Sequence, residues 1–291
     1  MSHHWRVLVN PAAGRRGVDR ARLATVLTAA GLDHDIEVIE GASAMRRRAV
    51  ELAGEPLALA GGDGTISLVV DALLGAGVEQ PPLLGVIPTG TGCDLLRTFG
   101  VKPTMEAAIE RLAGTGEQLI DAGRLEGAFG VRYFINVAQA GAGAAAAQTA
   151  PGLPRGWGRI RYPIAFLARL PGFPRVRVQV STDRPVTAEA LGVIFANAQF
   201  FAGGWNVAPK ALLVDGELDV QVITAFKRQA FSLVPKIIKG VHLSDPSVIR
   251  RSAATFEVVT DQPWPVEADG DLVGFTPIRV STIPGAIRLK I

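Results

Sequence analysis

The chain has 291 residues, of which 48% are hydrophobic and 20% are charged, a size and balance that predict two domains and exclude wholesale disorder. Its one cysteine, Cys93, excludes an internal disulfide and a cysteine-based zinc site, and no apolar stretch reaches the roughly 20 residues of a membrane span, so we expect a cytoplasmic protein. The net charge of +3 does not indicate nucleic-acid binding, and no nucleic-acid partner is expected.

The first 125 residues alternate short β-rich runs with helical stretches. Strands are expected at residues 5–9, 35–39, 56–60 and 83–87, and helices at residues 20–30 and 66–74. Because strand and helix follow each other in turn, residues 1–125 are predicted to form an α/β domain with a parallel sheet.

From about residue 126 the pattern changes to runs rich in Val, Phe and Ile. Strands are expected at 131–137, 175–181, 191–196, 218–223, 254–259 and 278–283. Residues 126–291 are therefore predicted to form a mainly antiparallel β domain, whose last strand can return to the first domain. Residues 138–150 are rich in Gly and Ala and indicate a tight loop or a closely packed helix.

Residues 155–173 interleave arginines with aromatic and apolar side chains, within a longer region, 127–182, that has seven arginines and no acidic residue. This mixture is suited to an anionic membrane surface. Packing of the segment within the β domain is the alternative, because Pro163 and Pro171 shorten any helix.

Three glycine-rich segments directly follow expected strands. They are Asn10-Pro11-Ala12-Ala13-Gly14, Gly61-Gly62-Asp63-Gly64-Thr65, and residues 88–94, which include Gly90, Thr91 and Asp94. Ligands bind at this edge of a parallel sheet, glycine lets the backbone approach an anion, and a helix N-terminus adds about half a positive charge. The three segments therefore predict a phosphate site, although no Walker motif occurs.

Asp63 lies between two glycines, where a carboxylate can hold Mg²⁺ or its waters beside a triphosphate. Thr65 and Asp94 have a simpler alternative, because Thr and Asp are common helix N-caps. Further along, the Asp215 carboxylate and neighbouring carbonyl groups can bind a hard cation, with an ordinary β-turn as the alternative.

The three glycine-rich segments resemble the nucleotide-binding loops of the diacylglycerol kinase catalytic-domain family, which includes bacterial lipid kinases and sphingosine kinases. The Gly61–Thr65 element is shared with NAD kinases, whereas the other two segments favour lipid kinases. Residues 197–219 are also similar to a long family pattern. That similarity implies a structural Mg²⁺ held by Asp215 and by backbone oxygens near Leu212 and Glu217.

Residues 266–271 are similar to the Asp-Gly-Glu motif of the same family, with Asp271 in place of Glu. The resemblance implies that Asp269, with Asp271, deprotonates the lipid hydroxyl that attacks the γ-phosphate of ATP. A hairpin turn is the alternative for this Asp-Gly pair. Asp94 and Asp121 are expected to complete a Mg²⁺ water network with Asp63.

Taken over the whole chain, the resemblance implies a Rossmann-like (phosphofructokinase-like) α/β domain at 1–125 and an antiparallel β-sandwich at 126–291. It implies an ATP-dependent, Mg²⁺-requiring kinase of diacylglycerol or a related sphingoid or glycerolipid, peripheral at the inner face of the membrane. The sequence is also compatible with a homodimer.

Three departures from the family pattern keep other functions open. Cys93 precedes Asp94, Ser67-Leu68 replace Asn-Glu, and Ala144 to Ala147 follow Gly141-Ala142-Gly143 where the family usually has Asp. Cys93, Ser67 and Leu68 motivate one alternative, a nucleotide- or lipid-binding relative without turnover. The other alternative is a small-molecule kinase similar to NAD kinases.

Overall fold

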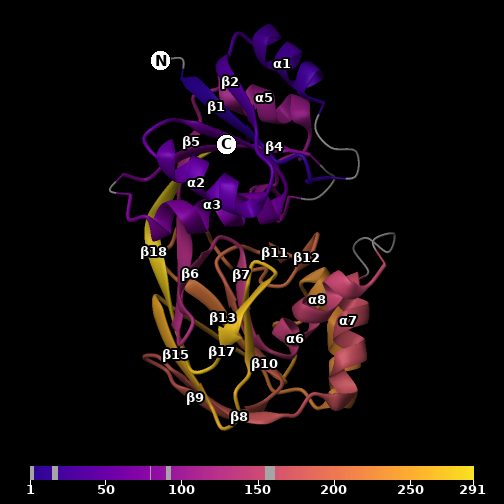
Figure 1. Cartoon of the computed structure of the whole chain (residues 1–291). Coiled ribbons are helices and arrows are strands. Elements are labelled where there is room, and N and C mark those ends of the chain that lie inside the picture. Colours follow the sequence, from indigo (N-terminus) through magenta and orange to yellow (C-terminus); the bar gives the residue numbers. More distant parts are fainter. Residues whose placement is uncertain (1–2, 15–18, 79, 90–92, 155–160) are drawn as a thin grey trace. The chain divides into compact units, whose positions relative to one another are not determined.

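The computed structural model describes residues 3–14, 19–78, 80–89, 93–154 and 161–291 (Figure 1). The chain divides into two compact units, one formed by Met1–Asp121 with Pro284–Ile291 and the other by Ala122–Ile283. Strands β5 (Glu117–Gly127) and β18 (Ile278–Lys290) each contribute residues to both units.

The first unit contains a parallel sheet with the strand order β2-β1-β3-β4. Its strands are β1 (His4–Val9), β2 (Asp33–Val38), β3 (Leu57–Gly61) and β4 (Leu83–Pro88). The last residues of β18 extend it, because Arg288 pairs in parallel with Leu83. All residues of β3 and β4 are buried, as expected for strands that are covered on both faces.

Helices cover both faces of this sheet (Figure 1). Helices α1 (Arg20–Ala29) and α5 (Met105–Ala113) lie on one face, and α2 (Ala42–Glu51) and α3 (Asp63–Gly75) on the other. The short α4 (Asp94–Thr98) follows β4. Leu23 and Leu27 of α1 and Leu112 of α5 bury their side chains in the core of this unit.

The second unit is a β-sandwich of two antiparallel sheets. One sheet has the order β14-β13-β10-β7-β16-β17, and its strands are β7 (Val137–Gly141), β10 (Gly192–Ala196), β13 (Leu218–Ile223), β14 (Val248–Ala253), β16 (Pro265–Ala268) and β17 (Asp271–Phe275). In the other, β18 is followed by β15 (Thr255–Thr260), β8 (Val176–Ser181) and β9 (Val186–Ala190), and β5 pairs with both β18 and β6 (Gly130–Phe134).

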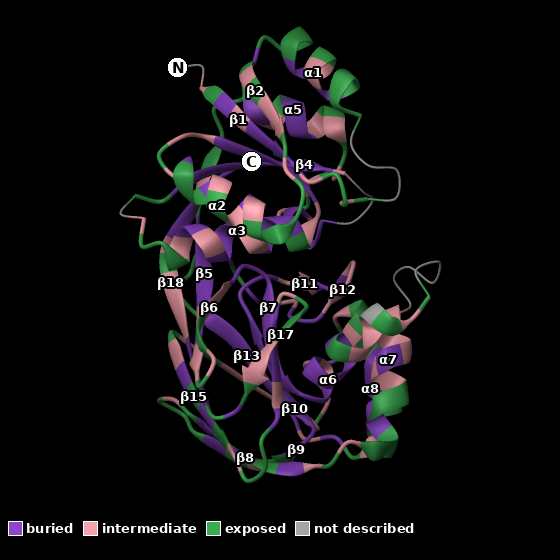
Figure 2. Cartoon of the chain, in the orientation of Figure 1, coloured by how far each residue is buried: buried purple, intermediate pink, exposed green. Residues whose placement is uncertain are grey.

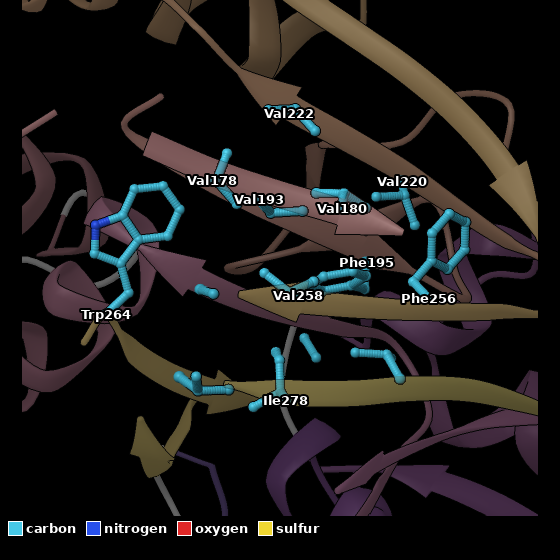
Figure 3. Packing of buried hydrophobic residues seen from close by; sticks show 14 of the residues in the cluster. Val178, Val180, Val193, Phe195, Val220, Val222, Phe256, Val258, Trp264 and Ile278 are labelled. Carbon is cyan, nitrogen blue, oxygen red and sulfur yellow. The ribbon is translucent and has the colours of Figure 1, made fainter. Parts of the chain in front are cut away.

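The core of the second unit lies between its two sheets. Figure 3 shows Val193, Phe195 and Val220 of one sheet facing Val178, Val258 and Ile278 of the other, with Trp264 at one end. Alternate residues of each strand enter this layer, because successive side chains of a strand point to opposite faces.

The opposite face of β7, β10 and β13 is covered by α6 (Ala142–Thr149), α7 (Arg161–Arg169), α8 (Lys227–Lys239) and a small hairpin of β11 (Phe200–Phe201) and β12 (Trp205–Asn206). Figure 2 shows by colour that these helices carry both buried and exposed residues. A short 3-10 turn follows α6 at Ala150–Gly152, and another follows α7 at Leu170–Gly172. Among the residues that the structure describes, no helix is both long and apolar enough to cross a bilayer.

Several expected elements differ from the structure in kind or in bounds. The single strand at 131–137 is wrong, since the chain breaks between β6 and β7. The helix expected at 66–74 begins at Asp63, so Thr65 is not its N-cap, and Asp94 is the first residue of α4 rather than its N-cap. Residues 138–150 end β7 and then form the closely packed helix α6.

Candidate functional site

Three chain segments meet at the carboxyl ends of β1, β3 and β4 in the first unit. Asn10 Nδ2 donates a hydrogen bond to Thr65 Oγ1 at 2.9 Å, and the Thr89 amide donates to the Gly61 carbonyl at 3.2 Å. Gly14 has a φ of 79°, and a Cβ there would lie 2.5 Å from the Thr89 carbonyl oxygen. The three glycine-rich segments therefore contact one another, although Gly90 and Thr91 of the third lie outside the described residues.

The segment after β1 is held by its first residue. Asn10 Oδ1 accepts a hydrogen bond from the Ala12 amide at 3.0 Å, and the Asn10 amide donates to Ala60 of β3. Pro11 and Gly14 are exposed. Asn10 thus fixes this turn against β3 and leaves the following residues open to a ligand.

The segment after β3 leads directly into helix α3. Gly62 is the N-cap, and its carbonyl accepts from the amides of Thr65 and Ile66. A Cβ on Gly61 would lie 2.5 Å from Thr65 Oγ1, whereas Gly62 and Gly64 have no atom within 4 Å of a Cβ position. The 13-residue helix therefore presents its positive N-terminal end beneath an open glycine surface, which suits a phosphate group.

Asp63 joins this segment to the segment after β4. Its Oδ1 accepts from the amides of Asp94 at 2.8 Å and Leu95 at 3.3 Å, at the start of α4. Burial, and next the charge of Asp94, raise the pKa of Asp63 to about 6. The Cys93 thiol is buried beside Asp63, and burial raises the pKa of this thiol. Two neighbouring carboxyl groups therefore lie at the edge of the sheet.

The structure brings Asp63 and Asp94 together and gives Asp121 a different contact. Asp94 is buried, with its Oδ1 3.7 Å from Arg97 Nε. Asp121, in β5, accepts a hydrogen bond from the Gly285 amide at 2.8 Å. Over the described part of the chain, no three His, Cys, Asp or Glu side chains are grouped to hold a metal ion.

The Asp63–Asp94 pair nevertheless fits one kind of metal site. Mg²⁺ beside a nucleotide is usually held by one or two carboxylates, with phosphate and water oxygens completing its shell. The charge of Asp94 disfavours ionisation of Asp63, and a divalent cation between them would remove that penalty. This donor set suits Mg²⁺ held by a bound triphosphate and not a cage formed by protein alone.

In the second unit, Asp269 organises the break between β6 and β7. Its Oδ2 accepts from the Ile135 amide at 2.8 Å, and its Oδ1 accepts from the amides of Asn136 at 2.9 Å and Val137 at 3.0 Å. Asp269 adopts a left-handed conformation with a φ of 48°, and its own amide donates to Val137. Three backbone donors therefore fix the position of this carboxylate.

Asp271, the second carboxylate of the same motif, is differently placed. Its side chain is 73% exposed and lies 3.5 Å from Arg132. Asp271 begins β17, after the turn at Gly270, whose φ is 97°. The predicted pair thus consists of one fixed and one exposed carboxylate.

A buried polar group next to Asp269 was missed by sequence reasoning. Glu267 is fully buried in β16, accepts from Gln139 Nε2 at 2.8 Å and from the Gly270 amide at 2.6 Å, and burial raises the pKa of Glu267 to about 8. Gln139 Nε2 also donates to the Tyr162 hydroxyl at 3.1 Å, and this hydroxyl donates to the Gly143 carbonyl. The available signal was a single polar residue within each of two apolar strands, β7 and β16.

Gln139 and Tyr162 also line an apolar pocket of the second unit. The pocket contains about 630 Å³ of empty space, part of which is open to solvent. It lies beneath α7 and α8, and its other walls come from β7, β10, β13, α6 and the β11–β12 hairpin. The lining includes Phe166, Val193, Ile194, Phe201, Trp205, Ile223, Leu233 and Val234. Such a lining suits a hydrocarbon chain, with Gln139 and Tyr162 as its polar contacts.

The segment around Asp215 forms a turn. Asp215 Oδ1 accepts from the Glu217 amide at 3.1 Å, and the Glu217 carboxylate bonds the Ser252 hydroxyl. Leu212 and Asp215 are exposed. This geometry is typical of an Asx turn, and the predicted cation site there stays a prediction.

Part of the arginine-rich segment packs inside the second unit. Residues 155–160 lie outside the described residues, and α7 begins at Arg161 with Pro163 in its first turn. Tyr162 and Phe166 line the apolar pocket, and Arg161 Nε donates to the Ala150 carbonyl at 3.1 Å. The aromatic residues of this helix therefore pack within the β domain, as the alternative prediction for this segment stated.

Two family models together span nearly the whole chain. The model of the diacylglycerol kinase catalytic domain matches residues 4–125. The model described as the YegS C-terminal NAD kinase beta sandwich-like domain matches residues 136–291.

Whole-length relatives agree with these matches. A diacylglycerol kinase of Mycobacterium tuberculosis is 30% identical over 97% of this chain and 93% of the relative. A Xanthomonas oryzae protein named probable lipid kinase YegS-like is 26% identical over 99% of this chain and 96% of that protein. The crystal structure of a diacylglycerol kinase from Bacillus anthracis matches with a TM-score of 0.77 at 21% identity, covering 99% of this chain and 96% of that one, which shows the shared fold.

Proposed function

This chain belongs to the diacylglycerol kinase family, and we propose that it transfers the γ-phosphate of ATP to a hydroxyl group of diacylglycerol or a related glycero- or sphingoid lipid. One observation carries the proposal. The three glycine-rich segments contact one another at the carboxyl edge of a parallel sheet, with Asp63 held between α3 and α4. That edge is where parallel sheets bind phosphates.

For the nucleotide, we assign the three segments to the triphosphate. Gly61, Gly62 and Gly64 allow close approach to the N-terminus of α3, and Thr65 is held by Asn10. The remaining residues of this set are Pro11, Gly14, Gly90 and Thr91. Because phosphoryl transfer depends on positioning and charge neutralisation, backbone amides such as those at the N-terminus of α3 would supply much of what the reaction needs.

We assign the Mg²⁺ that accompanies ATP to Asp63 and Asp94, with Asp121 in its water network. When bound, Mg²⁺ neutralises charge on the phosphates. The two carboxylates would hold the cation, and the amides of Asp94 and Leu95 keep Asp63 in place. A second, structural Mg²⁺ at Asp215, with backbone oxygens near Leu212 and Glu217, belongs to the same proposal.

For the acceptor, we assign the general base to Asp269 and a supporting role to Asp271. The base takes the proton of the lipid hydroxyl as that oxygen attacks the γ-phosphate. Fixed placement of Asp269 by Ile135, Asn136 and Val137 favours this assignment, because a base acts only within hydrogen-bond reach of the proton.

The apolar pocket supports a lipid acceptor. Burying a hydrocarbon chain there contributes about 0.8 kcal/mol per methylene group. Gln139 and Tyr162 offer an amide and a hydroxyl to the polar part of the same molecule. Since such lipids reside in membranes, we place the chain at the inner face of the membrane as a peripheral protein.

A labelled-phosphate screen tests the function. The full chain is incubated with γ-labelled ATP, Mg²⁺ and separate acceptors: diacylglycerol, a sphingoid base, a total lipid extract and NAD. Label in a lipid supports the proposal. Label in NAD alone indicates a small-molecule kinase, and ATP binding without any labelled acceptor indicates a relative that has lost turnover; both results contradict it.

A further inference from the structure

Helix α8 has two chemically different faces. Its inner face carries Ala230, Leu233, Val234 and Ile237, which line the apolar pocket. These residues recur at helical spacing, so one stripe of the helix forms a wall of the pocket.

The outer face of α8 is also apolar in part. Phe231 is 48% exposed and Ile238 is 38% exposed, and Pro235 between them is exposed. Phe226 at the N-cap is 60% exposed, and Val241 just after the helix is 58% exposed. Single exposed apolar residues are ordinary, but a row of them on one helix marks an interaction surface.

Basic side chains accompany this row. Helix α8 contains Lys227, Arg228, Lys236 and Lys239 and no acidic residue. Lys227 donates to the Pro171 carbonyl, and Lys236 pairs with Asp245 at 2.8 Å. At 100° per residue, Arg228 and Lys239 fall on the same side of the helix as Pro235, next to Phe231 and Ile238.

We propose that the outer surface of α8, formed by Arg228, Phe231, Pro235, Ile238 and Lys239, rests on an anionic lipid bilayer. Exposed aromatic and aliphatic side chains flanked by cations, without acids, are typical of helices that lie in a membrane interface. The inner face of the same helix lines the pocket, so a lipid that leaves the bilayer beside α8 reaches the pocket around this helix. The biological purpose of this surface rests on the proposed lipid kinase function, whereas the test of membrane binding does not depend on that function.

Vesicle binding tests the surface directly. The full chain is sedimented with vesicles of phosphatidylcholine alone and of equal parts phosphatidylcholine and phosphatidylglycerol. We expect binding to the anionic vesicles. In the double variant Arg228→Gln/Lys239→Gln the affinity for these vesicles falls about thirtyfold, since each cation near an anionic surface contributes roughly five- to sixfold. Phe231→Ser/Ile238→Ser lowers it by at least about tenfold.

Matched controls remove the same groups elsewhere on the second unit. Arg177→Gln/Arg279→Gln removes two exposed cations from β8 and β18, and Val259→Ser removes an exposed apolar side chain from β15. These variants bind like the wild type if the surface of α8 is responsible. Equal losses in controls and α8 variants, or unchanged binding of the α8 variants, overturn the inference.

Two further readouts distinguish membrane contact by α8 from self-association and from phosphoryl transfer. If Phe231→Ser/Ile238→Ser converts a dimer to a monomer in sedimentation analysis while vesicle binding is unchanged, the surface joins two copies of the chain and the inference fails. Turnover is also measured on short-chain diacylglycerol in solution. A wild type that binds vesicles through α8 but labels no lipid contradicts the kinase proposal alone, whereas soluble lipid turnover with intact vesicle binding by α8 variants contradicts this inference alone.

Discussion

The carboxyl group of Asp63 has two roles. It accepts hydrogen bonds from the first amides of helix α4, and it places a negative charge at the edge of the sheet. It accepts two amides of α4, which an asparagine oxygen can also accept. Asp63→Asn is therefore expected to fold normally and to lose about 10²-fold in Mg²⁺-dependent use of ATP, because only the charge is removed. Titration of activity with Mg²⁺ measures this.

Asp63→Ala is the companion variant. It lacks both charge and acceptor, so it should also lose about 1 kcal/mol of unfolding free energy, as helix caps do. If the activity of Asp63→Asn depends on Mg²⁺ as that of the wild type does, the side chain of Asp63 serves only to accept hydrogen bonds at the start of α4.

Glu267 makes folding sensitive to pH. Burial raises the pKa of Glu267 to about 8 from an ordinary value of 4.5, so between these pH values the folded chain keeps a proton that the unfolded chain has released. The stabilisation is complete below pH 4.5 and is lost as pH rises to about 8. Glu267→Gln removes this titration, so the difference in unfolding free energy between the wild type and the variant should change by up to about 1.4 kcal/mol per pH unit in that window.

Urea unfolding at several pH values from 5 to 9, in roughly unit steps, measures this difference. Glu110→Gln, on the exposed side of α5, is the control for the substitution itself. Parallel pH profiles for the wild type and Glu267→Gln would mean that Glu267 is ionised in the folded chain.

A substitution in the first turn of helix α3 can change ATP binding without lowering the stability of the fold. Gly64 lies in its first turn with no atom within 4 Å of a Cβ position, and alanine favours helices over glycine by up to about 1 kcal/mol. Gly64→Ala should leave the chain as stable or more stable. It should nevertheless weaken ATP binding about tenfold, because the new methyl group stands where we place the phosphates.

Isothermal calorimetry with ATP and thermal unfolding measure the two effects. Gly54→Ala is the matched control, since Gly54 also has no atom within 4 Å of a Cβ position and lies outside the three segments. If Gly64→Ala binds ATP as the wild type does, the N-terminus of α3 is not the phosphate site.

The pocket beneath α7 and α8 should determine acyl-chain selectivity. Ala142 lines it at the start of α6 and is 3% exposed. Ala142→Leu adds three carbon atoms to this space, at a cost of about 1–3 kcal/mol in stability. We expect a higher KM for long-chain diacylglycerol than for short-chain diacylglycerol, with ATP affinity unchanged.

Kinetics over a series of chain lengths measure this selectivity. Ala168→Leu, on the exposed side of α7, is the control and should change the KM for neither long-chain nor short-chain diacylglycerol. An equal rise of KM for all chain lengths in Ala142→Leu would place the acyl chain elsewhere.

Across the molecule, periodicity predicted the fold wherever the local pattern was strong. The α/β class of the first unit follows from buried runs such as Leu57–Gly61 alternating with helices, and the strand at Leu218–Ile223 was predicted at its observed bounds. The break between β6 and β7 was missed, because it depends on Asp269, more than 130 residues away in the sequence. The helices α2, α5 and α8 were not predicted. In α8 the apolar residues do recur at helical spacing, but Pro235 within the segment is typical of a helix end and not of a helix interior.

The candidate site was predictable to the extent that motifs are local. The contact of Asn10 with Thr65 and of Gly61 with Thr89 follows from the rule that strand-end loops share one edge of a parallel sheet. Glu267 and Gln139 carry no such signal. Their burial results from pairing of β7 with β16, a long-range contact that no sequence spacing expresses.

Transfer of labelled γ-phosphate from ATP to diacylglycerol by the wild type and by Asp269→Asn tests the kinase account most directly, with ATP affinity and thermal unfolding measured on both. The account predicts labelled lipid from the wild type, and a turnover lower by about 10² to 10⁴-fold in Asp269→Asn with ATP affinity retained. A wild type that binds ATP and labels no lipid, or an Asp269→Asn variant as active as the wild type, would contradict it.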